Sequence, residues 1–185
     1  MNTIPRSEHP KPQFRRDSWM NLNGQWAFEI DNGRSGKARG LHQADAQLSD
    51  TILVPFCPQS ELSGVNHKDF LYGVWYRRTV DLTKEQLSGR VVLHFGAVDY
   101  HCEAFVNGVS VGTHTGGYVS FCFDVTEAVH EGENVITVYA EDDERDPLIP
   151  RGKQSELFYS HGCDYTRTTG IWQTVWMEFL PETHI

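Results

Sequence analysis

The residues best suited to bind a ligand lie in one short segment toward the end of the sequence. Asp164, Tyr165, Arg167 and Trp172 bring a carboxylate, a guanidinium group and two aromatic rings close together along the chain. Sugars present apolar C–H faces rimmed by hydroxyl groups, so aromatic rings beside charged hydrogen-bonding groups match their chemistry. The sequence therefore predicts a carbohydrate-binding site at Asp164, Tyr165, Arg167 and Trp172.

Two of these residues also have a purely structural interpretation. Asp164 could pair with Arg167 and so order the loop that carries both. Trp172 and Trp176 fall at even spacing in a strand pattern, which suits side chains that point into a core. We assign Trp176 to the core, whereas both interpretations stay open for Trp172 at the junction of loop and strand.

A second set of carboxyl groups raises the question of hydrolysis. Glycoside hydrolysis needs two carboxyl groups about 5–10 Å apart, one protonated and one ionised. Glu156 and Asp164 share a loop and could be proposed as such a pair. Nothing in the sequence supplies the apolar pocket that would keep one of them protonated.

One motif matches serine hydrolases. Gly108-Val109-Ser110-Val111-Gly112 fits G-x-S-x-G, which requires a strained strand-to-helix turn that lifts the serine hydroxyl toward a base. Ser110 instead follows a hairpin signal inside an alternating strand pattern with no helix after it. We interpret the match as chance.

The sequence also contains histidines and acidic residues, but they match no known metal-binding motif. His94, His101 and His114 lie on neighbouring predicted strands without the fixed spacing of a metal motif. The acidic run at 142–146 fits no calcium-loop template. We therefore expect solvated or structurally hydrogen-bonded histidines, a solvated loop at the acidic run, and no metal site.

Composition narrows the class of protein. The chain has 185 residues, 39% of them apolar, and a net charge of −9 without a cluster of Lys and Arg, which argues against nucleic acid or an anionic membrane as partner. No apolar run is long enough to span a bilayer, and the first residues lack the apolar core of a signal peptide. The four cysteines lack close pairs, so we expect a reduced, cytoplasmic protein.

Strand patterns dominate the rest of the chain, and Asn107-Gly108 has the residue types of a two-residue hairpin turn. Single helical turns are indicated only at 83–87 and 126–130. Many short strands with little helix predict an all-β fold, an antiparallel jelly-roll β-sandwich with one long loop. The expected strands are 26–30, 52–54, 74–80, 91–95, 102–106, 109–113, 118–125, 135–139 and 172–179.

The domain organisation follows from the gaps between these strands. We expect one domain over 1–185, with an N-terminal arm at 1–20, a polar surface loop at 32–49 and a long loop at 142–167. Loops beyond about 15 residues are uncommon in compact domains and are often functional, and apolar residues such as Leu157 and Phe158 argue against disorder. The sequence ends soon after a strong strand pattern, as expected of a cut at a domain boundary.

Several motifs in order resemble one known family, the sugar-binding domain of family 2 glycoside hydrolases, which include β-galactosidases and β-glucuronidases. The motifs are Leu22-Asn23-Gly24-Gln25-Trp26, Val54-Pro55-Phe56, Val74-Trp75-Tyr76-Arg77-Arg78, the segments at 93–100, 106–108, 112–118 and 123–126, and Thr169-Gly170-Ile171. The resemblance implies a jelly-roll domain of the galactose-binding type. In the intact enzyme such a domain precedes an immunoglobulin-like domain and a TIM barrel.

The resemblance also implies where catalysis takes place. In this family the catalytic pair lies in the barrel, and the acid/base glutamate follows an asparagine. The chain contains no Asn-Glu dipeptide, and a TIM barrel alone needs about 250 residues. We therefore expect no catalytic residue in this chain and no hydrolysis by this chain alone.

One residue of the domain is implied in substrate binding. Family members carry an aspartate six positions before the glycine of the small-Gly-Ile motif, and it reaches toward hydroxyl groups of the terminal sugar; here that position is Asp164. In some β-galactosidases the same aspartate helps to hold a sodium ion, so a sodium near Asp164 in the full-length enzyme is possible, with no cofactor required in this domain. The alternative function is a free-standing carbohydrate-binding or lectin-like module. The sequence does not distinguish a galactoside from a glucuronide.

Overall fold

The computed structural model of the chain describes residues 4–181, 183 and 184. Within them lie twelve strands and three short 3-10 helices. The strands are β1 (Trp19–Asn21), β2 (Gly24–Ile30), β3 (Asp50–Val54), β4 (Gly73–Leu82), β5 (Arg90–Phe95), β6 (Val98–Asp99), β7 (His101–Val106), β8 (Val109–Thr115), β9 (Phe121–Asp124), β10 (Gly132–Glu141), β11 (Gly170–Ile171) and β12 (Val175–Leu180); the helices are η1 (Pro12–Phe14), η2 (Glu61–Ser63) and η3 (Thr126–Ala128).

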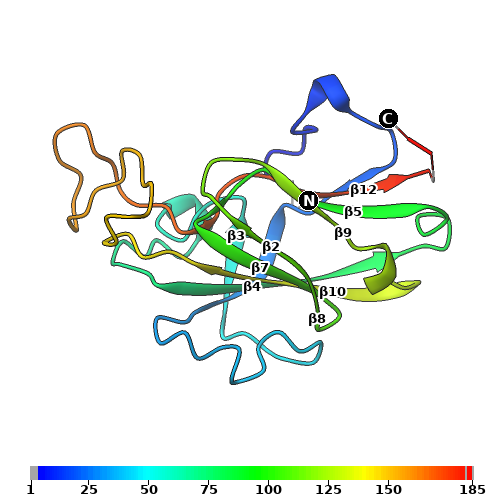
Figure 1. Ribbon diagram of the computed structural model, residues 1–185, viewed down its shortest axis with the longest axis horizontal. Coiled ribbons are helices and arrows are strands. Elements are labelled where there is room, and N and C mark those ends of the chain that lie inside the picture. The colour runs from blue at the N-terminus through cyan, green and yellow to red at the C-terminus, as the bar shows by residue number, and fades with distance from the viewer. Residues whose placement is uncertain (1–3, 182, 185) are drawn as a thin grey trace.

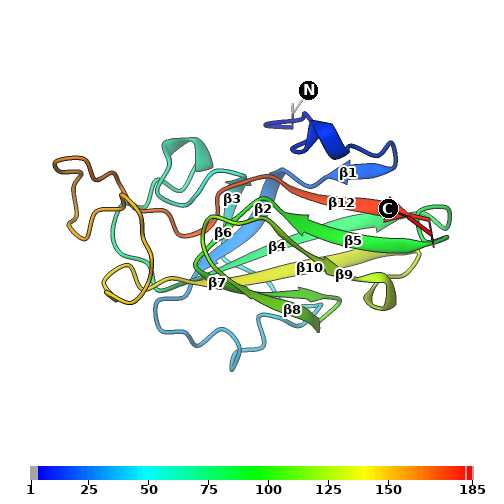
Figure 2. The same ribbon diagram turned by 45° about the horizontal axis from the view of Figure 1, so that its top comes forward.

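The strands form two main antiparallel sheets that face one another (Figures 1 and 2). The smaller sheet has the order β1-β12-β5-β9, and the larger one β3-β2-β4-β10-β7-β8. A further pair, β11 and β6, joins Gly170 to Asp99 and Ile171 to Val98 at one end of the sandwich. The prediction of an all-β antiparallel sandwich with little helix is confirmed.

Alternating apolar residues fill the space between the sheets. On β5, Val91, Leu93 and Phe95 are fully buried while their neighbours are not, and Trp26 and Phe28 are the buried residues of β2. Because successive side chains of a strand point to opposite faces, this spacing places one face of each sheet in the core. The hydrophobic pattern thus fixes the register of the sheets that carry the loops.

Strand β12 is buried on both faces. Met177 and Phe179 belong to the core between the sheets. Trp176 is 1% exposed, as predicted, but it stacks on His94 at 4.7 Å between ring centroids and has the His9 ring at its edge. The N-terminal segment that carries His9 thus covers the outer face of this strand. The predicted arm at 1–20 includes the first two residues of β1.

The hairpin between β7 and β8 forms as the residue types require. Asn107 and Gly108 both have positive φ, 52° and 83°, the conformation of the central residues of a type I′ turn. Ser110 lies on β8 and donates a hydrogen bond to Glu103 Oε1 at 2.7 Å. With no strand-to-helix turn at Ser110, the serine-hydrolase match is indeed chance.

The two predicted helical turns have different outcomes. Residues 126–130 include η3, whereas residues 83–87 form a turn without helix. That turn still has reciprocal capping bonds, from the Thr83 N–H to Gln86 Oε1 at 2.8 Å and from the Gln86 N–H to Thr83 Oγ1 at 3.4 Å.

The loop at 32–49 packs on the outer face of the larger sheet. Its Leu41 is 6% exposed and clusters with Trp75, Phe105 and Tyr139. The loop predicted at the surface therefore also covers a second, small core.

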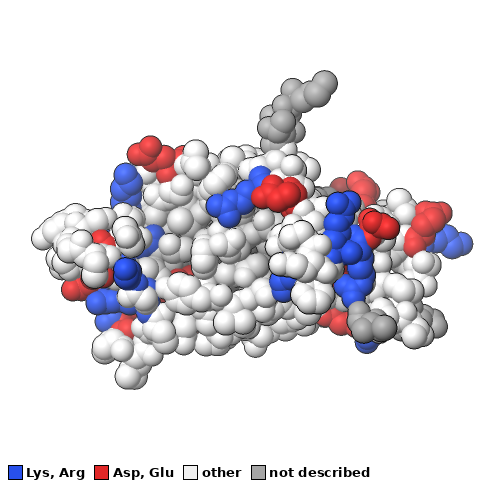
Figure 3. Space-filling view, turned by 90° about the horizontal axis from the view of Figure 1, so that it is seen from above, with Lys and Arg blue, Asp and Glu red and all other residues white. Residues whose placement is uncertain are grey.

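Two surface properties bear on partners. Lys and Arg side chains lie beside Asp and Glu side chains on the face shown in Figure 3, and they form no continuous basic patch there. Among the described residues no helix reaches the length and hydropathy that crossing a membrane requires. All four cysteines are free.

Candidate functional site

The long loop leaves β10 after Glu141 and rejoins the sandwich at β11, so it spans 142–169 in place of the predicted 142–167. It projects from one end of the sandwich, where it is drawn in yellow to orange (Figures 1 and 2). Both of its ends are fixed in strands, β10 within the larger sheet and β11 in the pair with β6. This arrangement can hold the loop in place while leaving its outer part accessible.

Arg167 fastens the base of the loop. Its guanidinium donates hydrogen bonds to the carbonyl oxygens of Ser155, Leu157 and Lys68, and its Nε lies 3.3 Å from Glu144 Oε2. The residue is 1% exposed, and its guanidinium stacks on Phe70 at 4.3 Å. Arg167 therefore ties together three segments of chain, and its burial does not favour the prediction that it contacts a sugar.

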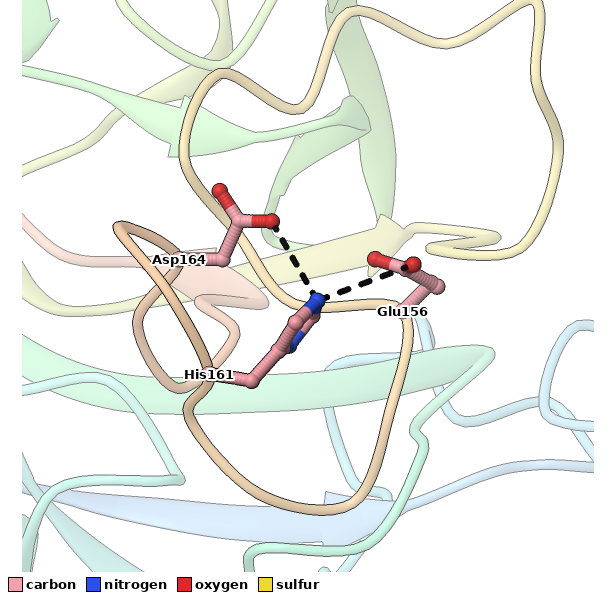
Figure 4. Close-up of side chains that lie close together, drawn as sticks. All are labelled: Glu156, His161 and Asp164. Carbon is pink, nitrogen blue, oxygen red and sulfur yellow. Dashed lines mark ion pairs between the residues drawn. The ribbon is translucent and has the colours of Figure 1, made fainter.

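Asp164 lies farther out on the same loop. Backbone hydrogen bonds join it to His161 in both directions, with N–O distances of 2.8 and 3.2 Å. Its side chain is 27% exposed, and its Oδ2 lies 3.8 Å from His161 Nε2 (Figure 4). In the described part of the chain Arg167 pairs with Glu144 rather than with Asp164, so the interpretation of an Asp164–Arg167 pair is wrong.

Tyr165 and Trp172 line one cavity of about 210 Å³. Trp172 donates from Nε1 to the Gly117 carbonyl oxygen at 2.8 Å and meets the Tyr118 ring edge-on, with centroids 6.1 Å apart. Tyr165 is 66% exposed. The two aromatic residues predicted to bind sugar are thus brought together, Trp172 held in a fixed orientation and Tyr165 open to solvent.

The cavity also contains a buried carboxyl group. Asp99 is 2% exposed and accepts a hydrogen bond from Gln154 Nε2 at 2.8 Å. Burial raises the pKa of Asp99 to about 6, although the Gln154 hydrogen bond opposes the shift. A protonated Asp99 can donate a hydrogen bond into the cavity, and an ionised one can only accept.

Two more buried carboxyl groups lie near Asp99. Burial, and after it the charges of Asp99 and Glu144, raise the pKa of Asp142 to about 8. Burial raises the pKa of Glu144 to about 7, while its hydrogen bond from Thr169 and the charge of Arg167 oppose the shift. Burial at the base of the loop therefore raises the pKa values of three carboxyl groups toward neutral pH.

Sequence reasoning missed Asp99 and Gln154, and it was wrong about Asp142 and Glu144, which were expected in a solvated loop but are each 4% exposed. One signal was present: Asp99 directly follows the apolar run at 97–98, and Asp142 follows the long strand pattern that ends at Ala140. An acidic residue at the end of an apolar run can be drawn into the core by the strand that precedes it. Gln154 left no such signal, because only the fold brings it to Asp99.

Glu156 and Asp164 do lie close together, but they are poorly suited to hydrolysis. Glu156 pairs with Arg151, with Nη2 and Oε2 3.1 Å apart. A hydrogen bond from its own backbone N–H, together with the charges of Arg151 and His161, lowers the pKa of Glu156. A general acid needs a raised pKa, so Glu156 is not suited to be the proton donor of such a pair.

The three strand histidines have structural contacts. His94 stacks on Trp176, His101 Nδ1 lies 2.8 Å from Thr115 Oγ1, and His114 stacks on Phe121 with centroids 3.9 Å apart. Within the described residues, the group with metal-ligand spacing is instead Glu156, His161 and Asp164.

Comparison with known proteins places this geometry in a family. Residues 19–181 match the family described as "Glycosyl hydrolases family 2, sugar binding domain". The chain belongs to this family. As a family 2 sugar-binding domain, it is similar to a β-galactosidase from Thermoanaerobacter pseudethanolicus, 34% identical over 120 residues that make up 64% of this chain and 15% of that protein. A β-galactosidase from Bacteroides ovatus is 28% identical over 94% of this chain and 19% of its own length.

Solved structures share the fold of this family 2 domain. A β-glucuronidase from Ruminococcus gnavus in complex with uronic deoxynojirimycin superposes with a TM-score of 0.72, covering 91% of this chain and 30% of that one at 21% identity. The chain thus spans between about a seventh and a third of the length of these relatives. The resemblance read from the sequence motifs is confirmed for the family and the fold.

Proposed function

We propose that this family 2 domain forms one wall of the sugar site of a longer retaining β-glycosidase of the β-galactosidase or β-glucuronidase type. Asp164 accepts hydrogen bonds from hydroxyl groups of the terminal sugar, and Tyr165 and Trp172 offer aromatic faces to its C–H groups. The observation that carries the proposal is the placement of Asp164, partly exposed on a loop whose base Arg167 holds in buried contacts. A carboxylate presented in this way is fixed in position yet open to a ligand.

Exposed apolar side chains on the same loop support the proposal that another domain covers this end of the sandwich. Leu148, Phe158, Tyr159 and Tyr165 are 60–86% exposed. Exposed large apolar side chains on one loop are a feature of surfaces that contact a partner. We propose that the sister domains of the full-length chain, an immunoglobulin-like domain and a TIM barrel following this jelly-roll domain, pack near this end.

The reactive carboxyl groups belong, in this proposal, to the barrel. The pKa of Glu156 is lowered, whereas a general acid needs a raised pKa, and the domain needs no cofactor of its own. A sodium ion beside Asp164 in the full-length enzyme is part of the same proposal. The four free cysteines support a reducing, cytoplasmic location.

A second function is favoured by the cavity at Trp172. Its volume of about 210 Å³, its aromatic lining and the buried Asp99 would also suit a free-standing carbohydrate-binding module. Such a module would bind sugar without sister domains. Binding of a glycan by the 185-residue chain alone would favour this alternative.

Kinetics of the full-length enzyme test the main proposal. Asp164→Ala and Asp164→Asn are compared with Asp81→Ala, which removes an exposed carboxylate from β4, on p-nitrophenyl β-glucuronide and p-nitrophenyl β-galactoside. We expect a raised KM and a lowered kcat in both Asp164 variants and wild-type values in Asp81→Ala. Unchanged kinetics on both substrates would remove Asp164 from the site.

A further inference from the structure

We propose that Glu156, His161 and Asp164 bind a divalent transition-metal ion such as Zn²⁺ that cross-links the outer part of the long loop. The three side chains converge from different points of the loop onto one small space (Figure 4). Their ligand atoms all lie within 4.8 Å of one another. Metal binding can be measured without any sugar, so the inference stands apart from the proposed function.

The distances suit an ion between the side chains better than direct hydrogen bonds. His161 Nε2 lies 3.9 Å from Glu156 Oε1 and 3.8 Å from Asp164 Oδ2, beyond hydrogen-bonding range. With zinc–nitrogen and zinc–oxygen bonds near 2.1 Å, two ligands at a tetrahedral angle are about 3.4 Å apart. To complete the coordination, the two His161 distances would shorten by about 0.5 Å and the two carboxylate oxygens would approach each other by up to about 1.4 Å.

A buried serine sets the tautomer of His161. Ser155 is 1% exposed, and its hydroxyl donates to the Tyr159 carbonyl oxygen at 2.8 Å. His161 Nδ1 lies 3.0 Å from the same hydroxyl oxygen. The hydroxyl has one proton and the carbonyl has none, so Nδ1–H of His161 must be the donor in the second contact.

When Nε2 of His161 carries no proton, this arrangement leaves a lone pair there that can ligate a metal. Nε2 faces two carboxylates, whose charge is balanced either by a proton on Nε2, as in the ion pairs of Figure 4, or by a cation bound between the three side chains. A histidine that ligates a metal through one nitrogen and donates from the other to a fixed acceptor is the usual arrangement of metal sites. The Ser155 contact thus orients His161 as a ligand.

The ligand set selects the class of ion. One imidazole nitrogen and two carboxylate oxygens suit zinc and other divalent first-row transition metals. Calcium and sodium instead prefer ligand sets made only of oxygen atoms. Arg151 contacts Glu156 through Oε2, which leaves Oε1 facing His161. Three protein ligands leave a fourth position of a tetrahedral ion open.

Titration of the purified protein tests the site. After removal of metals by chelation, ZnCl₂ is titrated by calorimetry, CoCl₂ by its visible absorption, and CaCl₂ serves as the oxygen-preferring comparison. We expect one zinc site that is lost in His161→Gln and Asp164→Asn and retained in His101→Gln, a histidine outside the group. Ser155→Ala should weaken zinc binding about tenfold or more. Zinc binding that survives in His161→Gln, or calcium binding as tight as zinc, would overturn the proposal.

Arg151 gives a sharper test of the Glu156 ligand. Arg151→Gln removes the cation that competes for the Glu156 carboxylate, so zinc should bind several-fold more tightly. Lys153→Gln removes the same charge from a nearby exposed side chain outside this ion pair. Equal tightening in both variants would show a general charge effect and would remove Glu156 from the ligand set.

Discussion

The Arg167 guanidinium packs against the Glu144 carboxylate, with Nε 3.3 Å from Oε2 and both side chains no more than 2% exposed. Glu144 also accepts a hydrogen bond from Thr169 Oγ1 at 3.0 Å, and the Thr169 hydroxyl accepts one from Gln59 Nε2 at 2.9 Å. The contacts join the start of the long loop, its end and the segment after β3. This buried polar network holds the base of the loop that carries Asp164.

Removing Arg167 should destabilise the fold. Arg167→Ala leaves Glu144 without its cation and three carbonyl oxygens without their donor, so we expect a loss of about 3–5 kcal/mol in the free energy of unfolding. Arg145→Ala is the matched control, because Arg145 also stacks on Phe70, at 3.7 Å, but is exposed. It should lose less than about 1 kcal/mol. Urea denaturation measures both, and equal losses would contradict a special role for the buried pair.

Stability should fall as the pH rises from about 4 to about 8. Burial raises the pKa of Asp142 to about 8, so the folded protein keeps a proton that the unfolded chain loses above its ordinary value of 3.8. The contribution of Asp142 is complete below that value and declines until the folded group ionises, by up to about 1.4 kcal/mol per pH unit.

The variant Asp142→Asn tests this dependence, because an amide stays neutral. Urea denaturation between pH 5 and pH 8 should show a shallower decline in Asp142→Asn than in the wild type. Asp81→Asn, at an exposed position, should keep the wild-type slope. A wild-type slope in Asp142→Asn would show that another group carries the dependence.

The close approach of Gly117 to Asp99 should make this glycine intolerant of a side chain. A Cβ at Gly117 would lie 2.1 Å from Asp99 Oδ1, whereas a Cβ at Gly33 would meet nothing within 4 Å. We expect Gly117→Ala to lower the free energy of unfolding by about 1–3 kcal/mol. Gly33→Ala should change it by less than about 0.5 kcal/mol. Thermal unfolding of the two variants side by side decides whether the contact is as tight as the structure shows.

Zinc should interfere with sugar binding if Asp164 serves both roles. An ion held by Glu156, His161 and Asp164 engages the carboxylate that we propose for the sugar hydroxyl groups. In the full-length enzyme we therefore expect added zinc to raise KM for a chromogenic glycoside. The zinc dependence, measured against a chelator control, should disappear in His161→Gln. Persistence of the effect in that variant would assign it to another site.

Much of the fold could be predicted from local patterns, because strands and tight turns depend on residue types nearby. The alternation of apolar residues predicted which face of β5 is buried. The residue types of Asn107-Gly108 predicted the hairpin, in which both residues have positive φ. Trp176 was correctly placed as buried, but the sequence did not show that His9, from the far end of the chain, would cover it.

The candidate site was predicted less completely, since burial of a charged residue depends on packing between distant segments. Asp164, Tyr165 and Trp172 lie at one end of the sandwich, as their spacing suggested, and whether they bind sugar stays a prediction. Arg167 was predicted to bind sugar because of its charge, yet its guanidinium is enclosed by Glu144 and Phe70. His161 gave no signal, because its interest comes from Ser155 and the two carboxylates that the loop brings to it.

The base of the long loop is held by buried contacts, whereas its outer turn is exposed. Selection for stability therefore acts mainly on the base, and selection for ligand binding acts mainly on the outer turn. Substitutions at Arg167 or Glu144 endanger the whole domain, whereas side-chain substitutions at 160–166 leave the Arg167 contacts with Glu144, Ser155 and Leu157 in place. Over evolutionary time the outer turn can therefore diversify at little thermodynamic expense. A protein engineer could graft alternative turns there to retune ligand preference on an unchanged scaffold.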